Sequence, residues 1–132
     1  MSELKTIRGI VGLSDAPPPI SQSALVIVDA QNTYREGVMQ LDGVEEALAE
    51  CRSLLERFRA ASRPIFHIRH DAGVGTPYDV TALNGAIADV VAPRDGEEVI
   101  TKHYPNSFVE TELDAKLKAQ GVEHLIIVGF MT

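Results

Sequence analysis

The sequence has few of the features that mark secreted or membrane-spanning proteins. It contains one cysteine, Cys51, which cannot form an internal disulfide and so fits a reducing compartment. No apolar run approaches the roughly 18 residues that span a membrane. The first residues include Glu3, Lys5 and Arg8 with no apolar segment behind them, so we do not expect a signal peptide. These absences predict a cytoplasmic protein with no membrane partner.

Positive charge is also scarce in this sequence. Twelve Lys and Arg residues against nineteen Asp and Glu residues give a formal net charge of -7. Nucleic acids attract proteins with a basic field, which this composition does not provide. We therefore expect a small molecule as the ligand, and no nucleic acid.

The feature that organises the chain is the apolar run from Ala24 to Val28, which ends abruptly at Asp29. A run without alternating polar residues is typical of a strand buried on both faces. Three later segments also have strand character: 64–71, 97–102 and 125–130. The length of 132 residues fits one domain.

Predicted helices separate some of these strands. Apolar residues recur at intervals of four and three along one predicted helix: Val44, Leu48, Cys51, Leu55, Phe58 and Ser62. Pro64 ends this helix, because proline disfavours helix at the residue before it. A second helix is predicted from about Thr111 to Gly121, and a helical turn or two within 81–91. This order of elements predicts an α/β fold with a mostly parallel sheet.

Residues 1–23 are expected to form an irregular N-terminal arm that lies along the body of the domain. The arm holds a short apolar patch and then three consecutive prolines, Pro17 to Pro19, which favour an extended chain. Cys51 falls on the apolar stripe of the first predicted helix. A free cysteine at such a position is expected to be a small core residue, not a reactive thiol.

Three predicted strands end in groups that can do chemistry. Because the carboxyl ends of parallel strands meet at one edge of a sheet, Asp29, Lys102 and the turn 129–132 should border the same crevice. An acid and a lysine placed together there are candidate catalytic groups. An ordinary ion pair at the sheet edge is the alternative, and spacing alone does not decide between them.

Other ligand sites fit the sequence poorly. Gly73 and Gly75 begin a dinucleotide-binding pattern, but Tyr78 stands where its third glycine should be. His67 and His70 lie three apart on a strand and so face opposite sides, which disfavours a shared metal ion. A nucleotide-binding response module would need an acidic cluster beside Asp29, which is missing. We expect no metal and no cofactor.

Four segments in order resemble the isochorismatase-like cysteine hydrolase family over residues 24–132. They are Leu25–Asn32, Pro64–His70, Lys102–Phe108 and Leu125–Thr132. The resemblance implies a three-layer α/β/α, Rossmann-like fold and a Cys-Asp-Lys triad. Asp29 matches the acid that takes the thiol proton, and Lys102 matches the lysine that keeps this acid ionised and stabilises developing negative charge.

The resemblance also implies an oxyanion hole. The backbone N–H of Met131 would supply half of it, next to a cis peptide bond expected between Phe130 and Met131. The family's cysteine follows about three residues after the threonine that Thr132 matches, and so is not among these residues. We therefore expect the 132-residue chain alone to be inactive. The family's last strands and helices are also missing, so we expect residues 24–132 to be the incomplete hydrolase domain of a longer polypeptide.

The substrate is less well defined than the reaction. Gln31, Tyr34, Phe108 and the loop 72–78 are expected to border the pocket, while His70 and Asp71 are interpreted as a solvated strand end. The predicted function is metal-independent hydrolysis of an amide or related C–N bond, or less often of a vinyl ether. The alternative is a non-catalytic binding or scaffold subunit. The family resemblance implies a homo-oligomer, and a companion chain could supply the missing part.

Overall fold

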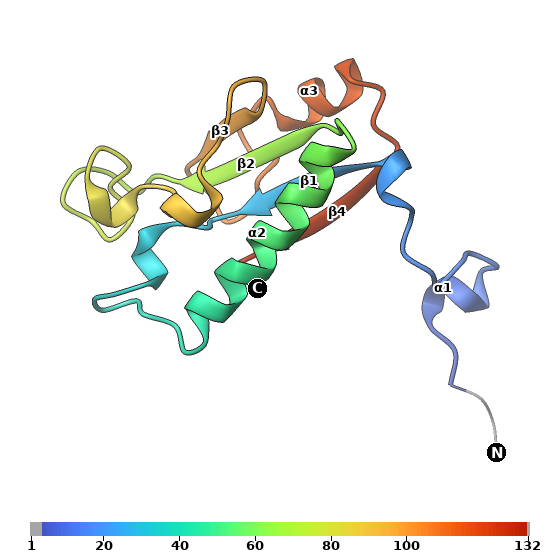
Figure 1. Ribbon diagram of the computed structural model, residues 1–132, viewed down its shortest axis with the longest axis horizontal. Coiled ribbons are helices and arrows are strands. Elements are labelled where there is room, and N and C mark those ends of the chain that lie inside the picture. Colours follow the sequence, from blue (N-terminus) through green and yellow to red (C-terminus); the bar gives the residue numbers. More distant parts are fainter. Residues whose placement is uncertain (1–3, 132) are drawn as a thin grey trace.

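The computed structural model describes residues 4–131 and contains one sheet of four parallel strands. The strands are β1 (Ser23–Val28), β2 (Ile65–His70), β3 (Glu98–Lys102) and β4 (His124–Gly129), in the spatial order β3-β2-β1-β4 (Figure 1). The predicted parallel α/β fold is confirmed.

The inner position of β1 explains its unbroken apolar run. β1 pairs with β2 on one side and with β4 on the other, so that Val26 lies between Phe66 and Ile127. Both faces of β1 are also covered, and Ala24 to Ile27 are at most 3% exposed. No position along these four residues faces water, so none needs a polar side chain.

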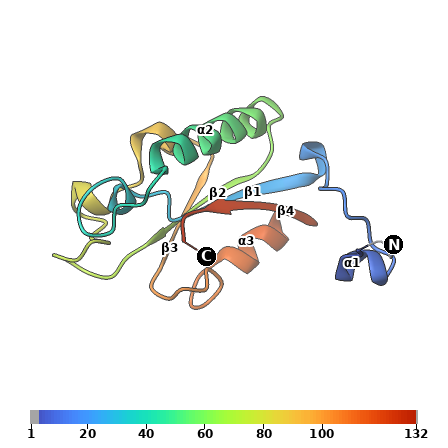
Figure 2. The same ribbon diagram turned by 90° about the horizontal axis from the view of Figure 1, so that it is seen from below.

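Two helices cover opposite faces of the sheet (Figure 2). α2 (Val44–Ala60) packs on one face, and the shorter α3 (Leu113–Ala119) packs on the other. The predicted apolar stripe of α2 is buried from Val44 to Phe58. Ser62 is wrong as a member of this stripe, because the helix ends at Ala60 and Ser62 is exposed with a φ of 53°.

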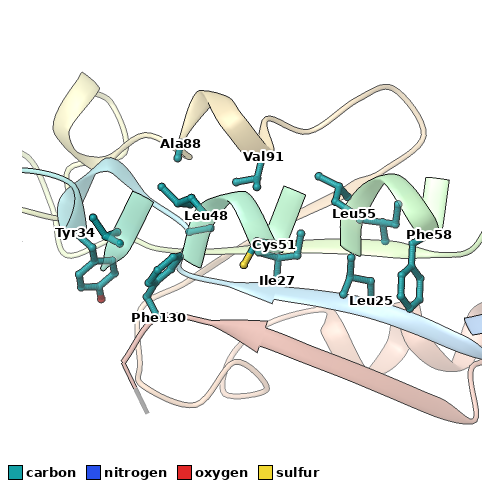
Figure 3. Packing of buried hydrophobic residues seen from close by; sticks show 13 residues of the cluster. Leu25, Ile27, Tyr34, Leu48, Cys51, Leu55, Phe58, Ala88, Val91 and Phe130 are labelled. Atoms are coloured by element: carbon teal, nitrogen blue, oxygen red, sulfur yellow. The ribbon is translucent and has the colours of Figure 1, made fainter. Parts of the chain in front are cut away.

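The core beneath α2 is the larger of two apolar clusters. Figure 3 shows Leu48, Leu55 and Phe58 of α2 pointing towards Leu25 and Ile27 of β1. Cys51 lies in the same cluster and is 8% exposed, which confirms that it is a core residue. Burial, with a smaller effect from the Glu50 charge, raises the pKa of its thiol, which disfavours the reactive thiolate.

The N-terminal arm differs from its expected form. It contains one helical turn, α1 (Ile7–Ile10), and the 3-10 turn η1 (Ile20–Gln22) precedes β1. The hydroxyl of Thr6 caps α1 by accepting the Gly9 N–H at 3.0 Å. Figure 1 shows α1 projecting away from the sheet, and Ile7 is 81% exposed. The expectation that the arm lies along the body is therefore wrong for its first part, where the apolar side chains from Ile7 to Leu13 are at least 54% exposed, whereas Ile20 packs against the core.

Short 3-10 turns complete the edge of the sheet where the strands end. η2 (Asn32–Tyr34) was not predicted, whereas η3 (Leu83–Gly85) and η4 (Asp89–Val91) provide the turns expected within 81–91. Gly85 is required at its position, since a Cβ atom there would lie 2.2 Å from the carbonyl oxygen of Asp79. This close approach brings the backbone of Gly85 against that of Asp79, next to Tyr78 in the same loop.

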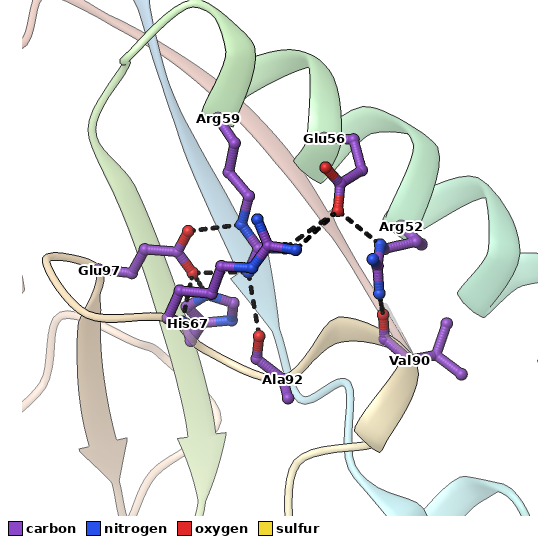
Figure 4. Close-up of polar contacts among 8 residues, drawn as sticks. Arg52, Glu56, Arg59, His67, Val90, Ala92 and Glu97 are labelled. Carbon is purple, nitrogen blue, oxygen red and sulfur yellow. Dashed lines mark hydrogen bonds and ion pairs between the residues drawn. The ribbon is translucent and has the colours of Figure 1, made fainter.

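A charged network lies on the α2 side of the sheet. Glu97 accepts hydrogen bonds from the Arg59 guanidinium at 2.7 and 2.9 Å, and its Oε1 lies 2.8 Å from His67 Nε2 (Figure 4). The Glu97 side chain is 9% exposed. Burial opposes its ionisation, but the hydrogen bonds from Arg59, Arg94 and His67 prevail and lower the pKa of Glu97 to about 2. Burial also lowers the pKa of His67.

We predict that Glu97→Gln destabilises the protein by about 3 kcal/mol at pH 7, because Arg59 loses its buried countercharge and keeps only the more exposed Glu56, at 3.3 Å. Unfolding by urea at pH 7 measures this loss. Glu46→Gln, at an exposed position of α2, is the matched control and should change the free energy of unfolding by less than about 0.5 kcal/mol.

The same network should make stability depend on pH. Glu97 binds protons less readily when folded, so its contribution is present above pH 4.5 and is lost as the pH falls towards 2. The lowered pKa of His67 acts in the same direction below pH 6.5. Glu97→Gln should therefore lose less stability than the unaltered protein between pH 5 and 3. An equal loss in both proteins would contradict this assignment.

Candidate active site

The ends of all four strands border one cavity of about 350 Å³. Asp29 follows β1, His70 ends β2, Lys102 ends β3 and Met131 lies beyond β4. Tyr34, Tyr78 and Pro105 complete the lining of the cavity. The parallel sheet thus brings Asp29, Lys102 and the residue after the last strand together, as the strand pattern suggests.

Lys102 is the centre of the polar contacts in this cavity. Its Nζ lies 3.2 Å from Asp29 Oδ2 and also donates to His70 Nδ1 at 3.0 Å and to the Tyr104 carbonyl at 3.2 Å. The Lys102 side chain is 2% exposed, and that of Asp29 is 12% exposed. A buried pair of this kind costs desolvation energy, which favours a functional reason for keeping it.

Asp29 combines three unusual properties. Burial raises the pKa of its carboxyl group, and the charge of Lys102 opposes only part of the rise. Its Oδ1 is buried and has no hydrogen-bond partner among residues 4–131. Its backbone adopts a φ of 56°, in the left-handed region that a residue with a side chain rarely enters. Strain and an unsatisfied buried oxygen at the same residue mark a functional site.

His70 belongs to the cavity and is not a solvated strand end. Its Nδ1 contacts Lys102, and its ring meets Tyr78 edge to face at a centroid distance of 5.0 Å. Burial and the charge of Lys102 lower the pKa of His70. Asp71 keeps the predicted role of a polar strand end, since its Oδ1 accepts the Gly73 N–H outside the cavity.

Aromatic rings form one wall of the cavity. The hydroxyl groups of Tyr34 and Tyr78 lie 2.8 Å apart, and Tyr34 stacks on Phe130. Burial, followed by the hydrogen bond with Tyr78, raises the pKa of Tyr34, so Tyr34 is a neutral hydrogen-bonding group. Tyr34 is predicted as a pocket residue, and the loop 72–78 contributes Tyr78.

Two other predicted pocket residues lie elsewhere. Gln31 is 1% exposed and does not line the cavity. Its Oε1 accepts the His70 N–H, and its Nε2 donates to the carbonyl oxygens of His70 and Gly85. Phe108 is 47% exposed and also lies outside the lining. Gln31 therefore supports the cavity from behind.

Met131 lines the cavity, but its backbone differs from expectation. The peptide bonds of residues 4–131 are all trans, so the cis bond expected between Phe130 and Met131 is absent. A trans bond is favoured by about 3 kcal/mol at a residue other than proline, and the 63% exposed Met131 has little packing to oppose it. Gly129 lets the end of β4 lie close to β1, since a Cβ atom there would lie 2.3 Å from the Val28 carbonyl oxygen.

Sequence reasoning missed Pro105, included Tyr78 only as the last residue of the loop 72–78, and undervalued His70. Tyr78 and Pro105 lie on irregular segments, where periodicity carries no information. The position of His70 at the end of a buried strand was the available signal, since the same argument identified Asp29 and Lys102.

Two other features are absent from residues 4–131. No group of three or more His, Cys, Asp or Glu side chains is arranged to hold a metal ion. No helix in this range is long and apolar enough to cross a membrane.

Comparison with known proteins places this fold and site in a family. The family model described as the isochorismatase domain matches residues 23–132. The chain therefore belongs to the isochorismatase family.

Individual relatives agree with this assignment. The chain is 36% identical to the secreted isochorismatase effector Isc1 of Verticillium dahliae, covering 97% of this chain and 68% of the relative. The crystal structure of an isochorismatase from Pseudomonas putida KT2440 matches with a TM-score of 0.91 at 36% identity, covering 98% of this chain and 66% of that one. The chain thus spans about two thirds of the length of these relatives.

Some more distant relatives are named for the reactions they catalyse. They include a ureidoacrylate amidohydrolase of Stutzerimonas stutzeri, 26% identical over 92% of this chain, and the streptothricin hydrolase of Streptomyces noursei, 28% identical over 83%. The chain covers 65% and 40% of these two proteins. The family therefore includes hydrolases.

We predict that Lys102→Met raises the pKa of Asp29 further, because the change removes the charge that favours the carboxylate. A carbon-detected NMR titration of the Asp29 carboxyl group measures both values. Lys118→Met, which removes a surface lysine paired with Asp114, is the control and should leave the titration of Asp29 unchanged. A pKa of Asp29 below the ordinary 3.8 in the unaltered protein would contradict this electrostatic description.

Proposed function

We propose that this domain carries two parts of the catalytic centre of a metal-independent cysteine hydrolase that cleaves an amide or related C–N bond. Asp29 is the base and Lys102 is its charged partner. The observation that carries the proposal is the unsatisfied Oδ1 of Asp29, buried beside a cavity and next to a lysine. A buried acceptor without a partner costs roughly 1–3 kcal/mol, and a thiol proton would satisfy it.

The proposed reaction follows from these groups. Asp29 Oδ1 accepts the thiol proton, and the thiolate attacks the carbonyl carbon of the substrate. The C–N bond breaks as Asp29 returns the proton to the leaving nitrogen, which leaves a thioester. Water then attacks the thioester, giving one proton to Asp29, and the acid product leaves as that proton returns to the sulfur.

The raised pKa of Asp29 suits this role. A carboxylate with a higher proton affinity is a better base for a thiol, provided that it is ionised at the working pH. The Met131 N–H is proposed as half of the oxyanion hole, a position that the family resemblance supports. The hydrolases among the relatives support the C–N bond as the target.

The nucleophile of this proposal is a thiol that the 132 residues do not include. Cys51 does not serve, because it lies in the core beneath α2 and outside the cavity. We propose the cysteine expected about three positions after Thr132, carried by the same polypeptide or supplied by a companion chain. On this proposal the 132 residues alone have no hydrolase activity.

A non-catalytic binding subunit is the second candidate, favoured by the burial of Cys51. Alkylation of the natural protein with iodoacetamide, mapped by mass spectrometry, separates the two functions. The hydrolase requires a fast-reacting cysteine other than Cys51, whereas the binding subunit requires none.

We predict that Asp29→Asn, made in the natural protein with its proposed cysteine, lowers kcat for amide hydrolysis by a factor of about 10² to 10⁴, since the amide cannot accept the thiol proton. Ammonia release from a panel of primary amides and N-carbamoyl compounds measures the rate, with Glu46→Gln as the control. In the unaltered protein, activity should fall with decreasing pH through the raised pKa of Asp29. Full activity of Asp29→Asn would exclude Asp29 as the base.

A further inference from the structure

His70 has one ring nitrogen that neither the fold nor the proposed reaction uses. Its Nδ1 lies 3.0 Å from Lys102 Nζ, whereas Nε2 makes no hydrogen bond within residues 4–131. The ring lines the same cavity as Asp29 and Lys102. Nε2 is therefore the ring atom left for a ligand.

The contact with Lys102 fixes which nitrogen of His70 carries the proton. An ammonium group has three donors and no acceptor, so the Nδ1 that it contacts must accept. A neutral His70 then carries its proton on Nε2. The neutral form is favoured because burial, Lys102 and His103 lower the pKa of His70, against the charges of Asp29 and Asp71.

The surrounding residues also fix the direction of this donor. The His70 N–H donates to Gln31 Oε1 at 2.9 Å, and Gln31 Nε2 donates back to the His70 carbonyl at 3.0 Å. The His70 and Tyr78 rings meet edge to face at an interplanar angle of 78°. Backbone and ring are thus both held, and a donor held in this way loses little entropy when it binds an acceptor.

We propose that His70 is a specificity residue that donates its Nε2–H to a second acceptor oxygen of the substrate. The site would then select small, flat amides or ureides that carry another carbonyl beside the one that is cleaved. This inference rests on the proposed hydrolysis, in which the cleaved carbonyl faces the Met131 N–H. The aromatic wall of Tyr34 and Tyr78 and the cavity of about 350 Å³ suit a ligand of this size and shape.

Two probes of similar shape test the proposed donor directly. Malonamide carries a second carbonyl, and butanamide has an ethyl end in its place. Nitrogen-15 NMR of the histidine rings in the natural protein should show His70 neutral with its proton on Nε2 at pH 7. Malonamide should shift the Nε2 signal and bind roughly five to ten times more tightly than butanamide, as expected for one neutral hydrogen bond. A charged ring, a proton on Nδ1, or an equal response to both probes overturns the proposal.

Two substitutions test whether His70 donates to the ligand through Nε2 or serves only to accept from Lys102 through Nδ1. His70→Gln places an amide N–H near Nε2 but loses the acceptor at Nδ1, whereas His70→Asn does the reverse. His70→Gln should keep the dissociation constant for malonamide within about threefold, and His70→Asn should raise it about five- to tenfold. The opposite order, or equal losses, overturns the proposal. His124→Gln, at the far end of β4, is the control.

Ammonia release distinguishes this inference from the hydrolase proposal. Selective binding of malonamide without ammonia release from any amide supports the role of His70 and counts against hydrolysis. Amide hydrolysis with no preference for malonamide supports the hydrolase and overturns the role of His70.

Discussion

The ion pair between Asp29 and Lys102 depends on the order of the strands in the sheet. β1 and β3 are not neighbours, because β2 lies between them. Asp29 and Lys102 therefore meet across the end of β2, where His70 contributes its Nδ1 to the same ammonium group. Three strand ends converge on one cation, so a shift of β2 by one residue would replace His70 and turn its side chain to the other face. The parallel register is thus a requirement of the site as well as of the fold.

The buried carboxylates of Glu97 and Asp29 have different properties. Glu97 is matched by Arg59, and its pKa is lowered to about 2 because the carboxylate is well satisfied. Asp29 has a lysine partner, yet its pKa is raised and one oxygen has no hydrogen bond within residues 4–131. The Glu97 site and the proposed reactive site thus differ in whether hydrogen bonds satisfy all oxygens of the buried carboxylate. Because the fold supplies enough hydrogen bonds for the Glu97 carboxylate, the missing hydrogen bond at Asp29 supports the proposal that Asp29 has a chemical role.

The parts of the structure that sequence predicted are those governed by periodic burial. The run before Asp29 indicates a strand covered on both faces, and the stripe from Val44 to Phe58 indicates α2, because each pattern follows from repeated geometry. The ends of strands then locate Asp29 and Lys102. Tyr78 and the buried role of Gln31 depend on how irregular loops fold back, as where Gly85 meets the Asp79 backbone, and no period encodes such contacts. The course of the arm was mispredicted because neither its short apolar patch nor its three prolines encodes where the chain runs, and the residues of that patch are exposed.

The contacts of Lys102 limit what this residue can offer a substrate. An ammonium group has three N–H donors, and here they face Asp29 Oδ2, His70 Nδ1 and the Tyr104 carbonyl. No donor is left for a substrate oxygen unless one of these contacts is given up. In the proposed reaction Lys102 therefore acts on developing negative charge through its field, which is strong in a buried site, and not through a hydrogen bond. Direct hydrogen bonds must then come from other groups: the Met131 N–H and the His70 Nε2–H are the donors of the proposal, and the paired hydroxyls of Tyr34 and Tyr78 also line the cavity. The number of N–H groups on Lys102 thus limits its part in the proposal: Lys102 favours the ionised form of Asp29 and the neutral form of His70, and His70 donates to the ligand.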